Sequence, residues 1–284
     1  MRGSILMVLS MAGFALEDML LKSVAQSLPV GEILMIFGLG GMLAFMVLAA
    51  RRGERALHPA ILSRAILLRA LCESAGRLFY TLAIALTPLS SASAILQATP
   101  LVVVGGAALI FGERVGWRRW TAIAIGFAGV LIILRPGVEG FSLASLLAVA
   151  GMLGFAGRDL ATRAAPPVLS NLQLGIYGFF MLIPTGAALL AFTGGAVLPD
   201  PQQAALLLAA TTVGVGAYYA LTAAMRIGEV SVITPFRYTR LLFALILGVL
   251  VFAERPDAPT LIGSAVVVAS GLYTLLRSAR LRRG

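Results

Sequence analysis

Long apolar stretches follow one another from Ser4 almost to the end of this chain, separated by short polar connections. A bilayer core about 30 Å thick requires about 20 apolar residues for each helical crossing. No soluble domain of this size has such a composition, with 60% of 284 residues hydrophobic and 12% charged. The pattern therefore predicts an all-α membrane protein with ten transmembrane helices, at residues 4–22, 30–50, 62–86, 91–111, 117–134, 142–164, 172–192, 204–225, 230–252 and 260–276.

Basic residues gather in alternate connections between these spans. In a soluble protein the net charge of +10 would suggest nucleic-acid binding. Here thirteen arginines fall in one set of connections and at the termini, whereas only Lys22, Arg135 and Arg255 fall in the other set. Such a bias places the arginine-rich side in the cytoplasm. We predict a bacterial inner-membrane protein with both termini cytoplasmic, and nucleic acid is not needed to explain the charge.

Few residues suit chemistry or a tightly bound cofactor. The chain has one cysteine, Cys72, inside an apolar span, and one histidine, His58, in a basic loop. Neither a disulfide framework nor a cluster of metal ligands is available from these residues. The glycines at 38–41 lack the strand and downstream acid of a dinucleotide site, so they indicate helix packing. The sequence predicts no enzymatic activity, no metal and no cofactor, and leaves a membrane-embedded transferase as a weaker alternative.

An internal repeat with an offset of 141 residues divides the chain. Asp18 and the pair Glu113–Arg114 reappear as Asp159 and Glu254–Arg255. The surrounding matches include Met11, Gly13, Phe14 and Ala15, which reappear as Met152, Gly154, Phe155 and Ala156. We predict two five-helix units, at residues 1–137 and 138–284. Because five is an odd number, the second unit enters the membrane from the opposite side, and such inverted repeats are typical of transporters.

Two stretches carry a resemblance to a known family. They are residues 87–114, TPLSSASAILQATPLVVVGGAALIFGER, and residues 233–277, ITPFRYTRLLFALILGVLVFAERPDAPTLIGSAVVVASGLYTLLR. The chain resembles the drug/metabolite transporter superfamily in its EamA-type branch, nearest to amino-acid exporters of the YddG type. The resemblance implies export of amino acids or related small metabolites by alternating access through a central cavity. Carriers of nucleotide-linked metabolites, S-adenosylmethionine or lipids remain alternatives, and oligomeric state and proton coupling stay open.

Ionisable groups inside membrane spans are expensive, so each is a functional candidate. Arg69, Glu73 and Arg77 recur every four residues and therefore share one helix face. Arg237 suits a substrate carboxylate, and Glu73 or an aromatic such as Tyr80 or Tyr238 suits an ammonium group. The predicted cavity residues are Glu73, Arg77, Tyr80, Gln97, Arg158, Tyr218, Arg237 and Tyr238, and the predicted gate or coupling residues are Glu17, Asp18, Asp159 and Arg240.

Structural alternatives accompany these assignments. Asp18 and Lys22, like Asp159 and Arg163, are four residues apart and can neutralise each other near helix ends. The face of Arg69, Glu73 and Arg77 can equally be an ion ladder that packs against neighbouring helices. Pro100 and Pro235 predict kinks in the fourth and ninth spans, either moving or static. Glu113 and Glu254 are interpreted as anchors at helix ends.

Overall fold

The structure of the chain is a computed structural model, and it describes residues 2–112, 116–135, 142–164, 168–227 and 234–281. Every secondary-structure element among these residues is a helix. The first half contains α1 (Arg2–Val24), α2 (Val30–Arg51), the short 3-10 helix η1 (Pro59–Leu62), α3 (Arg64–Leu86), α4 (Leu89–Leu96), α5 (Thr99–Phe111) and α6 (Trp117–Leu134). The second half contains α7 (Ser145–Arg163), α8 (Asn171–Thr193), α9 (Pro201–Ile227), the 3-10 helix η2 (Thr234–Tyr238), α11 (Thr239–Phe252) and α12 (Ala258–Leu281).

Several of these helices have the length and composition of a membrane span. They are α1, α2, α4 together with α5, α8, and Pro201–Leu221 of α9. Apolar segments of α6 and α12 are shorter. α3 and α7 carry charged side chains along their length, which lowers their hydropathy, and most of these charges lie inside the protein. The fold is thus that of a multi-pass membrane protein, as the apolar pattern predicts.

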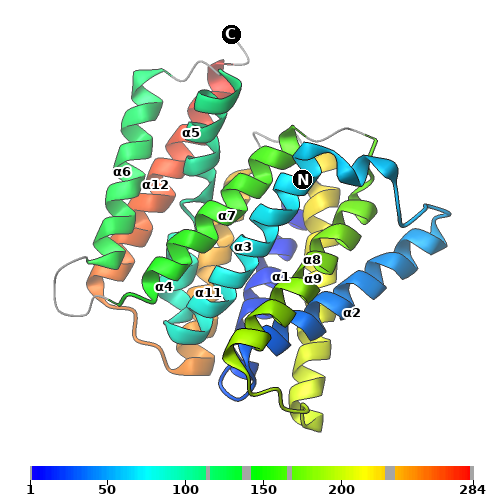
Figure 1. The fold of residues 1–284 in the computed structure, drawn as a ribbon. Coiled ribbons are helices and arrows are strands. Elements are labelled where there is room, and N and C mark those ends of the chain that lie inside the picture. Colours follow the sequence, from blue (N-terminus) through cyan, green and yellow to red (C-terminus); the bar gives the residue numbers. More distant parts are fainter. Residues whose placement is uncertain (1, 113–115, 136–141, 165–167, 228–233, 282–284) are drawn as a thin grey trace.

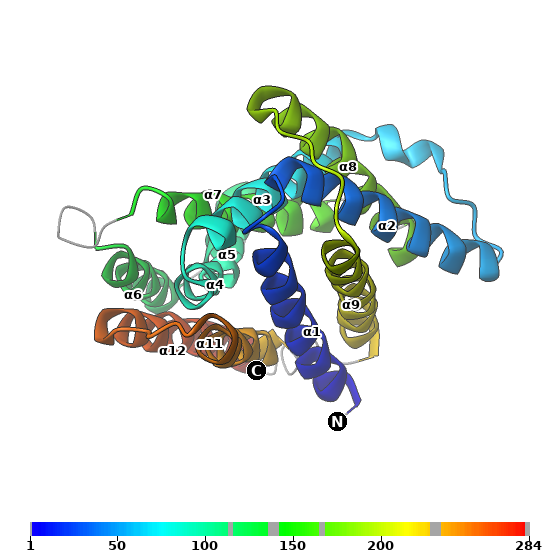
Figure 2. The same ribbon diagram turned by 90° about the horizontal axis from the view of Figure 1, so that it is seen from below.

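Helices from the two halves of the chain pack in pairs. α1 lies along α9, α2 along α8, α3 along α7 and α6 along α12, an arrangement that Figure 2 shows from below. Glycines permit close approach, since a Cβ on Gly154 of α7 would lie 2.5 Å from the Cα of Gly76 of α3. Small residues at such crossings bring helix backbones into van der Waals contact. Apolar side chains of α2, α3 and α8, among them Phe37, Ile84 and Leu182, belong to the core.

The fourth predicted span is broken in mid-course. α4 ends at Leu96, and α5 begins at Thr99 with Pro100 in its first turn, a position where the missing N–H of proline is not needed. The Thr99 hydroxyl donates to the Leu96 carbonyl (2.5 Å), and the Gln97 side-chain amide donates to the carbonyl of Arg237 in η2 (3.2 Å). The predicted kink at Pro100 is confirmed, and it brings the fourth span against the irregular start of the ninth.

Candidate functional site

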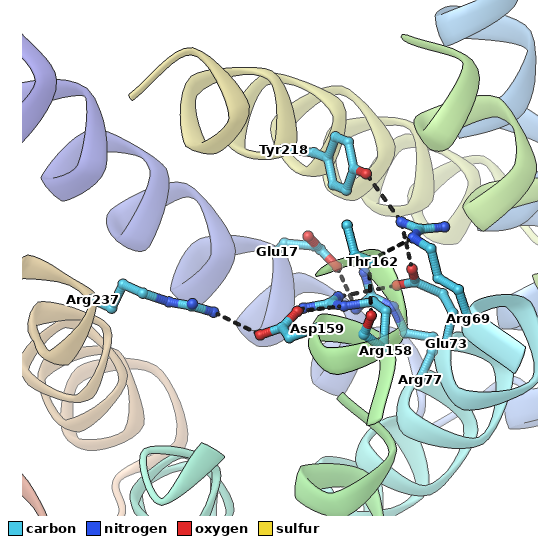
Figure 3. A network of polar contacts seen from close by, with 9 residues as sticks. All are labelled: Glu17, Arg69, Glu73, Arg77, Arg158, Asp159, Thr162, Tyr218 and Arg237. Atoms are coloured by element: carbon cyan, nitrogen blue, oxygen red, sulfur yellow. Dashed lines mark hydrogen bonds and ion pairs between the residues drawn. The ribbon is translucent and has the colours of Figure 1, made fainter. Parts of the chain in front are cut away.

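A network of ion pairs joins α3 and α7 in the middle of the protein (Figure 3). Arg69 pairs with Glu73 on α3 (3.1 Å), and Arg158 of α7 bonds both Glu73 (3.1 Å) and Asp159 (2.9 Å). From the opposite side, Arg237 of η2 approaches Asp159 at 3.7 Å. Arg69 also donates to Thr162 (3.0 Å) and Tyr218 (3.3 Å), which adds α9 to the network. Seven side chains from α3, α7, α9 and η2 thereby hold one another in place.

Two further pairs anchor α1. Glu17 forms an ion pair with Arg77 of α3 (2.6 Å), and Asp18 accepts a hydrogen bond from Arg240 of α11 at 2.6 Å. Tyr80 donates to Asp18 at 3.3 Å. Both carboxylates are fully buried, with 0% of each side chain exposed. A buried carboxylate without its cationic partner would be strongly destabilising, so these pairs fix α1 between α3 and α11.

The charges of the central network and of the two pairs on α1 do not balance among the described residues. In the described part of the chain, five guanidinium groups, those of Arg69, Arg77, Arg158, Arg237 and Arg240, face the four carboxylates of Glu17, Asp18, Glu73 and Asp159. One positive charge is in excess. A buried excess cation favours an anionic partner, and Arg237 is the guanidinium with the longest ion pair and the most exposed side chain, at 27%.

A third cluster ties helices together at one end of the bundle. The Glu254 carboxylate accepts from the backbone N–H groups of Leu89 (2.5 Å) and Ser90 (3.0 Å) and from the Ser90 hydroxyl (2.7 Å). It therefore caps the first turn of α4, where free N–H groups and the helix dipole favour a negative charge. Lys22 of α1 lies 3.7 Å from Glu254 and donates to the carbonyls of Ile84 and Thr87. We name Lys22, Glu254 and the first turn of α4 the end latch.

The residue before Glu254 adopts an unfavourable backbone conformation. Ala253 adopts the left-handed conformation, with φ of 52°, which is unfavourable for a residue with a Cβ. The position 141 residues earlier is Gly112, which adopts the same region with φ of 65° and no such penalty. The turn is thus a shared feature of both halves, and in the second half it is kept despite the penalty.

Most predicted site residues meet in the central network. Glu73, Arg77, Arg158 and Tyr218 line it together with Glu17, Asp159 and Arg237. Tyr80 and Arg240 join it through Asp18. Gln97 contacts the backbone of Arg237 rather than a side chain of the network. The Tyr238 hydroxyl is buried near Gly271, with no hydrogen-bond partner among the described residues. That these residues bind a substrate or gate it stays a prediction.

One of the two predicted pairings, Asp18 with Lys22, differs from the structure. Lys22 pairs with Glu254, and Asp18 pairs with Arg240, because the neighbouring helix offers a partner closer than the next turn of α1. Asp159 pairs with Arg158 and Arg237, while the side chain of Arg163 lies outside the described part. Glu254 acts as the expected helix-end anchor, and Glu113 lies outside the described residues. Sequence reasoning missed Ser93 and Thr162, small hydroxyls that bond Tyr80 and Arg69 and carry no distinctive spacing.

Two hollows lie away from the central network. One, of about 520 Å³, is bordered by the end latch and by Gln26, Pro88 and Val251–Ala253. The other, of about 450 Å³, lies between α6 and α12.

An exposed pair links the connections that follow α6 and precede α12. Asp257 accepts hydrogen bonds from Thr260 and pairs with Arg135, and these contacts lower the pKa of Asp257 to about 2. Since the pKa is lowered on folding, the contribution of this pair is fully present at pH 7 and is lost only as the pH falls towards 2. Because the pair is exposed, it stabilises the fold by about 1 kcal/mol or less.

Comparisons with known proteins agree with this architecture. The profile of the EamA-like transporter family matches residues 1–135 and again residues 141–276. A crystal structure covers 98% of this chain and 98% of its own, with a TM-score of 0.67 and 17% sequence identity, which shows a shared fold.

Characterised relatives are named as transporters of different solutes. A riboflavin transporter of Rhizobium johnstonii is 30% identical over 70% of this chain. The match covers 66% of that protein, just under two thirds of its length. An S-adenosylmethionine uptake transporter of Rickettsia prowazekii is 24% identical, over 73% of this chain and 70% of its own. The pseudopaline exporter CntI of Pseudomonas aeruginosa is 27% identical over 94% of both chains. With both halves matched, the chain belongs to the EamA-like transporter family, as its resemblance to the drug/metabolite transporters predicts.

Proposed function

We propose that this protein exports amino acids, or small metabolites that contain an amino-acid group, by alternating access. Ten membrane spans form two inverted five-helix repeats, residues 1–137 and 138–284. The protein lies in the bacterial inner membrane with both termini cytoplasmic. In Figure 1 the first turn of α1 and the last turn of α12 lie towards the same end of the bundle, which supports termini on one side.

Helix boundaries support the repeat. An offset of 141 residues takes Val30, where α2 begins, to Asn171, where α8 begins, and takes Trp117, where α6 begins, to Ala258, where α12 begins. The same offset takes Phe111, where α5 ends, to Phe252, where α11 ends. The family profile also matches once in each half.

Packing supports a twofold relation between the repeats. Exchanging the halves converts the pair α1 and α9 into the pair α7 and α3, and it leaves the pairs α2 with α8 and α6 with α12 unchanged. The exchange also holds for single contacts, because Gly13 approaches Ala217 as Gly154 approaches Gly76. With five spans per repeat, the axis lies in the membrane plane, and one fold can open to either side.

The observation that carries the substrate proposal is the pair of Arg237 and Asp159. At 3.7 Å it is the loosest ion pair of the central network, and its side chains are 27% and 23% exposed, compared with 13% and 0% for Arg77 and Glu17. An α-amino acid presents one carboxylate and one ammonium. The substrate carboxylate can take the place of Asp159 beside Arg237, while the substrate ammonium pairs with Asp159. Every charge then stays paired.

The names of the relatives accord with such a solute. S-adenosylmethionine, the solute named for one relative, carries an α-amino acid group. The relative named as an exporter matches this chain over nearly its full length, which favours outward transport.

A second candidate solute is a flavin-like aromatic compound. The riboflavin transporter is among the relatives with 30% identity. Phe45, Phe179 and Tyr218 form an aromatic cluster beside Arg69, with ring centroids 5.4–6.4 Å apart, and such faces stack on flat rings.

Uptake into proteoliposomes tests both candidates. Purified protein is supplied with a panel of radiolabelled amino acids, S-adenosylmethionine and riboflavin, with and without a pH gradient. Saturable amino-acid uptake above that of empty liposomes supports the proposal. Uptake of riboflavin alone supports the second candidate, and no uptake of any amino-acid-containing solute by folded protein overturns the first. The response to the pH gradient decides proton coupling.

Opening the end latch is expected to expose the interior to the periplasm. Glu254→Ala removes three hydrogen bonds to a charged acceptor, each worth about 1.5 to 3 kcal/mol. The reporter is a cysteine at Ser93, one turn below Ser90 and buried, in a Cys72→Ala background. In intact cells, labelling by a membrane-impermeant maleimide is expected to become about tenfold faster or more, since 1.4 kcal/mol corresponds to tenfold.

The adjacent residue provides the control. Arg255 is exposed and contributes no contact to the end latch among the described residues, so Arg255→Gln is expected to leave the labelling rate unchanged. Equal rates for Glu254→Ala and the parent protein would mean that this cluster does not close the periplasmic side.

A further inference from the structure

The outer face of the pair formed by α6 and α12 contains a hollow separate from the central network. This pair stands at one edge of the bundle (Figures 1 and 2). The two helices touch closely at Gly129 and Gly263, where a Cβ on Gly129 would lie 2.9 Å from the Gly263 carbonyl oxygen. Nearer the start of α6, the small residues Ala122 and Ser270 leave a space of about 450 Å³. That volume is within the range of small-molecule sites.

The lining of this hollow is apolar at its centre and amphipathic at its end. Ala122 and Ile125 form the wall, and Trp117, Arg118 and Tyr273 lie at the end. Trp117 and Tyr273 are exposed, and tryptophan and tyrosine in such positions mark the boundary between hydrocarbon and headgroups. The hollow therefore begins at the membrane interface and continues into the depth of the hydrocarbon.

Arg118 gives the hollow a positive charge. Its guanidinium lies over the Trp117 ring, 5.3 Å from the centroid. Among the described residues that line the hollow, none is acidic. In the sequence, Arg119 follows Arg118 directly, and Arg277, Arg280, Arg282 and Arg283 follow Tyr273. A guanidinium held at this depth matches the phosphate of a lipid headgroup.

We propose that this hollow binds an anionic phospholipid of the cytoplasmic leaflet, with its phosphate on Arg118 and an acyl chain between α6 and α12. Anionic lipids are attracted to basic segments on this side of the membrane. A second copy of the protein fits less well, because its apolar face would cover Arg118 without supplying a counter-charge. The site lies apart from the Arg237–Asp159 pair and does not depend on the transported solute.

The chain offers an internal fluorescent probe for this site. Its two tryptophans are Trp117 and Trp120, both on α6. In the Trp120→Phe variant, all tryptophan emission comes from Trp117. The protein is reconstituted into phosphatidylcholine bilayers in two parallel titrations. One adds increasing fractions of phosphatidylglycerol with brominated acyl chains, and the other adds phosphatidylcholine with brominated acyl chains. Bromine quenches tryptophan fluorescence on contact, so quenching reports which lipid lies against Trp117.

Quenching is expected to show about fivefold preference for brominated phosphatidylglycerol, which corresponds to about 1 kcal/mol for one arginine near the surface. Arg118→Gln is expected to abolish most of this preference and Arg118→Lys to retain part of it. Arg135→Gln, at the other end of α6, is expected to keep it. Arg118 is exposed, so its replacement leaves the packing of α6 intact.

Two results would overturn the proposal. The first is equal quenching by the two brominated lipids, or a preference that survives Arg118→Gln. The second is weak quenching by both lipids that rises as the protein is diluted in the bilayer, which would show that a second copy covers the hollow. Neither result bears on whether amino acids are transported.

Discussion

Replacing Asp18 with alanine is expected to abolish most of the folded protein. Asp18 lies 2.6 Å from Arg240 with none of its side chain exposed, so the substitution leaves a guanidinium buried without its partner. Breaking a buried pair in this way typically destabilises a protein by about 3 to 5 kcal/mol. Thermal unfolding in mild detergent, together with size-exclusion chromatography, measures the loss.

Removing both charges is expected to restore the fold. Asp18→Ala combined with Arg240→Met eliminates the unpaired cation, and such apolar replacements of buried pairs are often close to neutral. Asp257→Asn is the matched control, because its partner Arg135 is at the surface and its loss costs about 1 kcal/mol or less. If Asp18→Ala alone unfolds at nearly the parent temperature, the pair does not hold α1. Transport is then measured for the folded double variant. Transport equal to that of the parent protein shows that the pair is structural, whereas loss of transport shows that it acts as a gate.

Arg237→Ala is expected to raise the apparent KM for an amino-acid substrate by about 10-fold to 150-fold. Hydrogen bonds to a charged group contribute about 1.5 to 3 kcal/mol, and a substrate carboxylate would lose its guanidinium partner. Arg237→Lys keeps the positive charge but not the bidentate geometry of arginine. Its apparent KM is expected to lie between that of the parent protein and that of Arg237→Ala. The measurement is the concentration dependence of uptake into proteoliposomes.

Arg255→Gln provides the comparison for this series, because it removes an exposed arginine outside the central network. Its apparent KM is expected to equal that of the parent protein. An Arg237→Ala protein with an unchanged KM would place the substrate carboxylate elsewhere, and the excess positive charge of the network would then be structural.

The helices were predictable because membrane insertion leaves a strong local signal. Apolar stretches place α2, α6 and α8 within one or two residues of their observed bounds. The break near Gln97 follows from Pro100, since proline cannot continue a hydrogen-bonded turn. These features depend on residues that are neighbours in the sequence.

Partners within the site were not predictable in the same way. Spacing by four suggests that Asp18 pairs with Lys22, yet each finds its counter-charge on α11 or just after it. The two halves also carry different charges at matching positions, because Glu17 corresponds to Arg158 and Arg77 corresponds to Tyr218. The repeat therefore predicts where polar side chains gather, whereas their pairing depends on which helices meet in the folded chain.

The central claim is that Arg237 and Asp159 separate to receive both charged groups of one amino acid. Competition in proteoliposomes tests it most directly: a transported, radiolabelled amino acid is challenged by its unlabelled form, its N-acetyl derivative and its methyl ester. The account predicts that the unlabelled parent competes fully and that each derivative requires at least about tenfold higher concentration, because each lacks one charge partner. Competition by the N-acetyl derivative or the methyl ester at the concentration of the parent would contradict it, since one of the two charged groups would then go unrecognised.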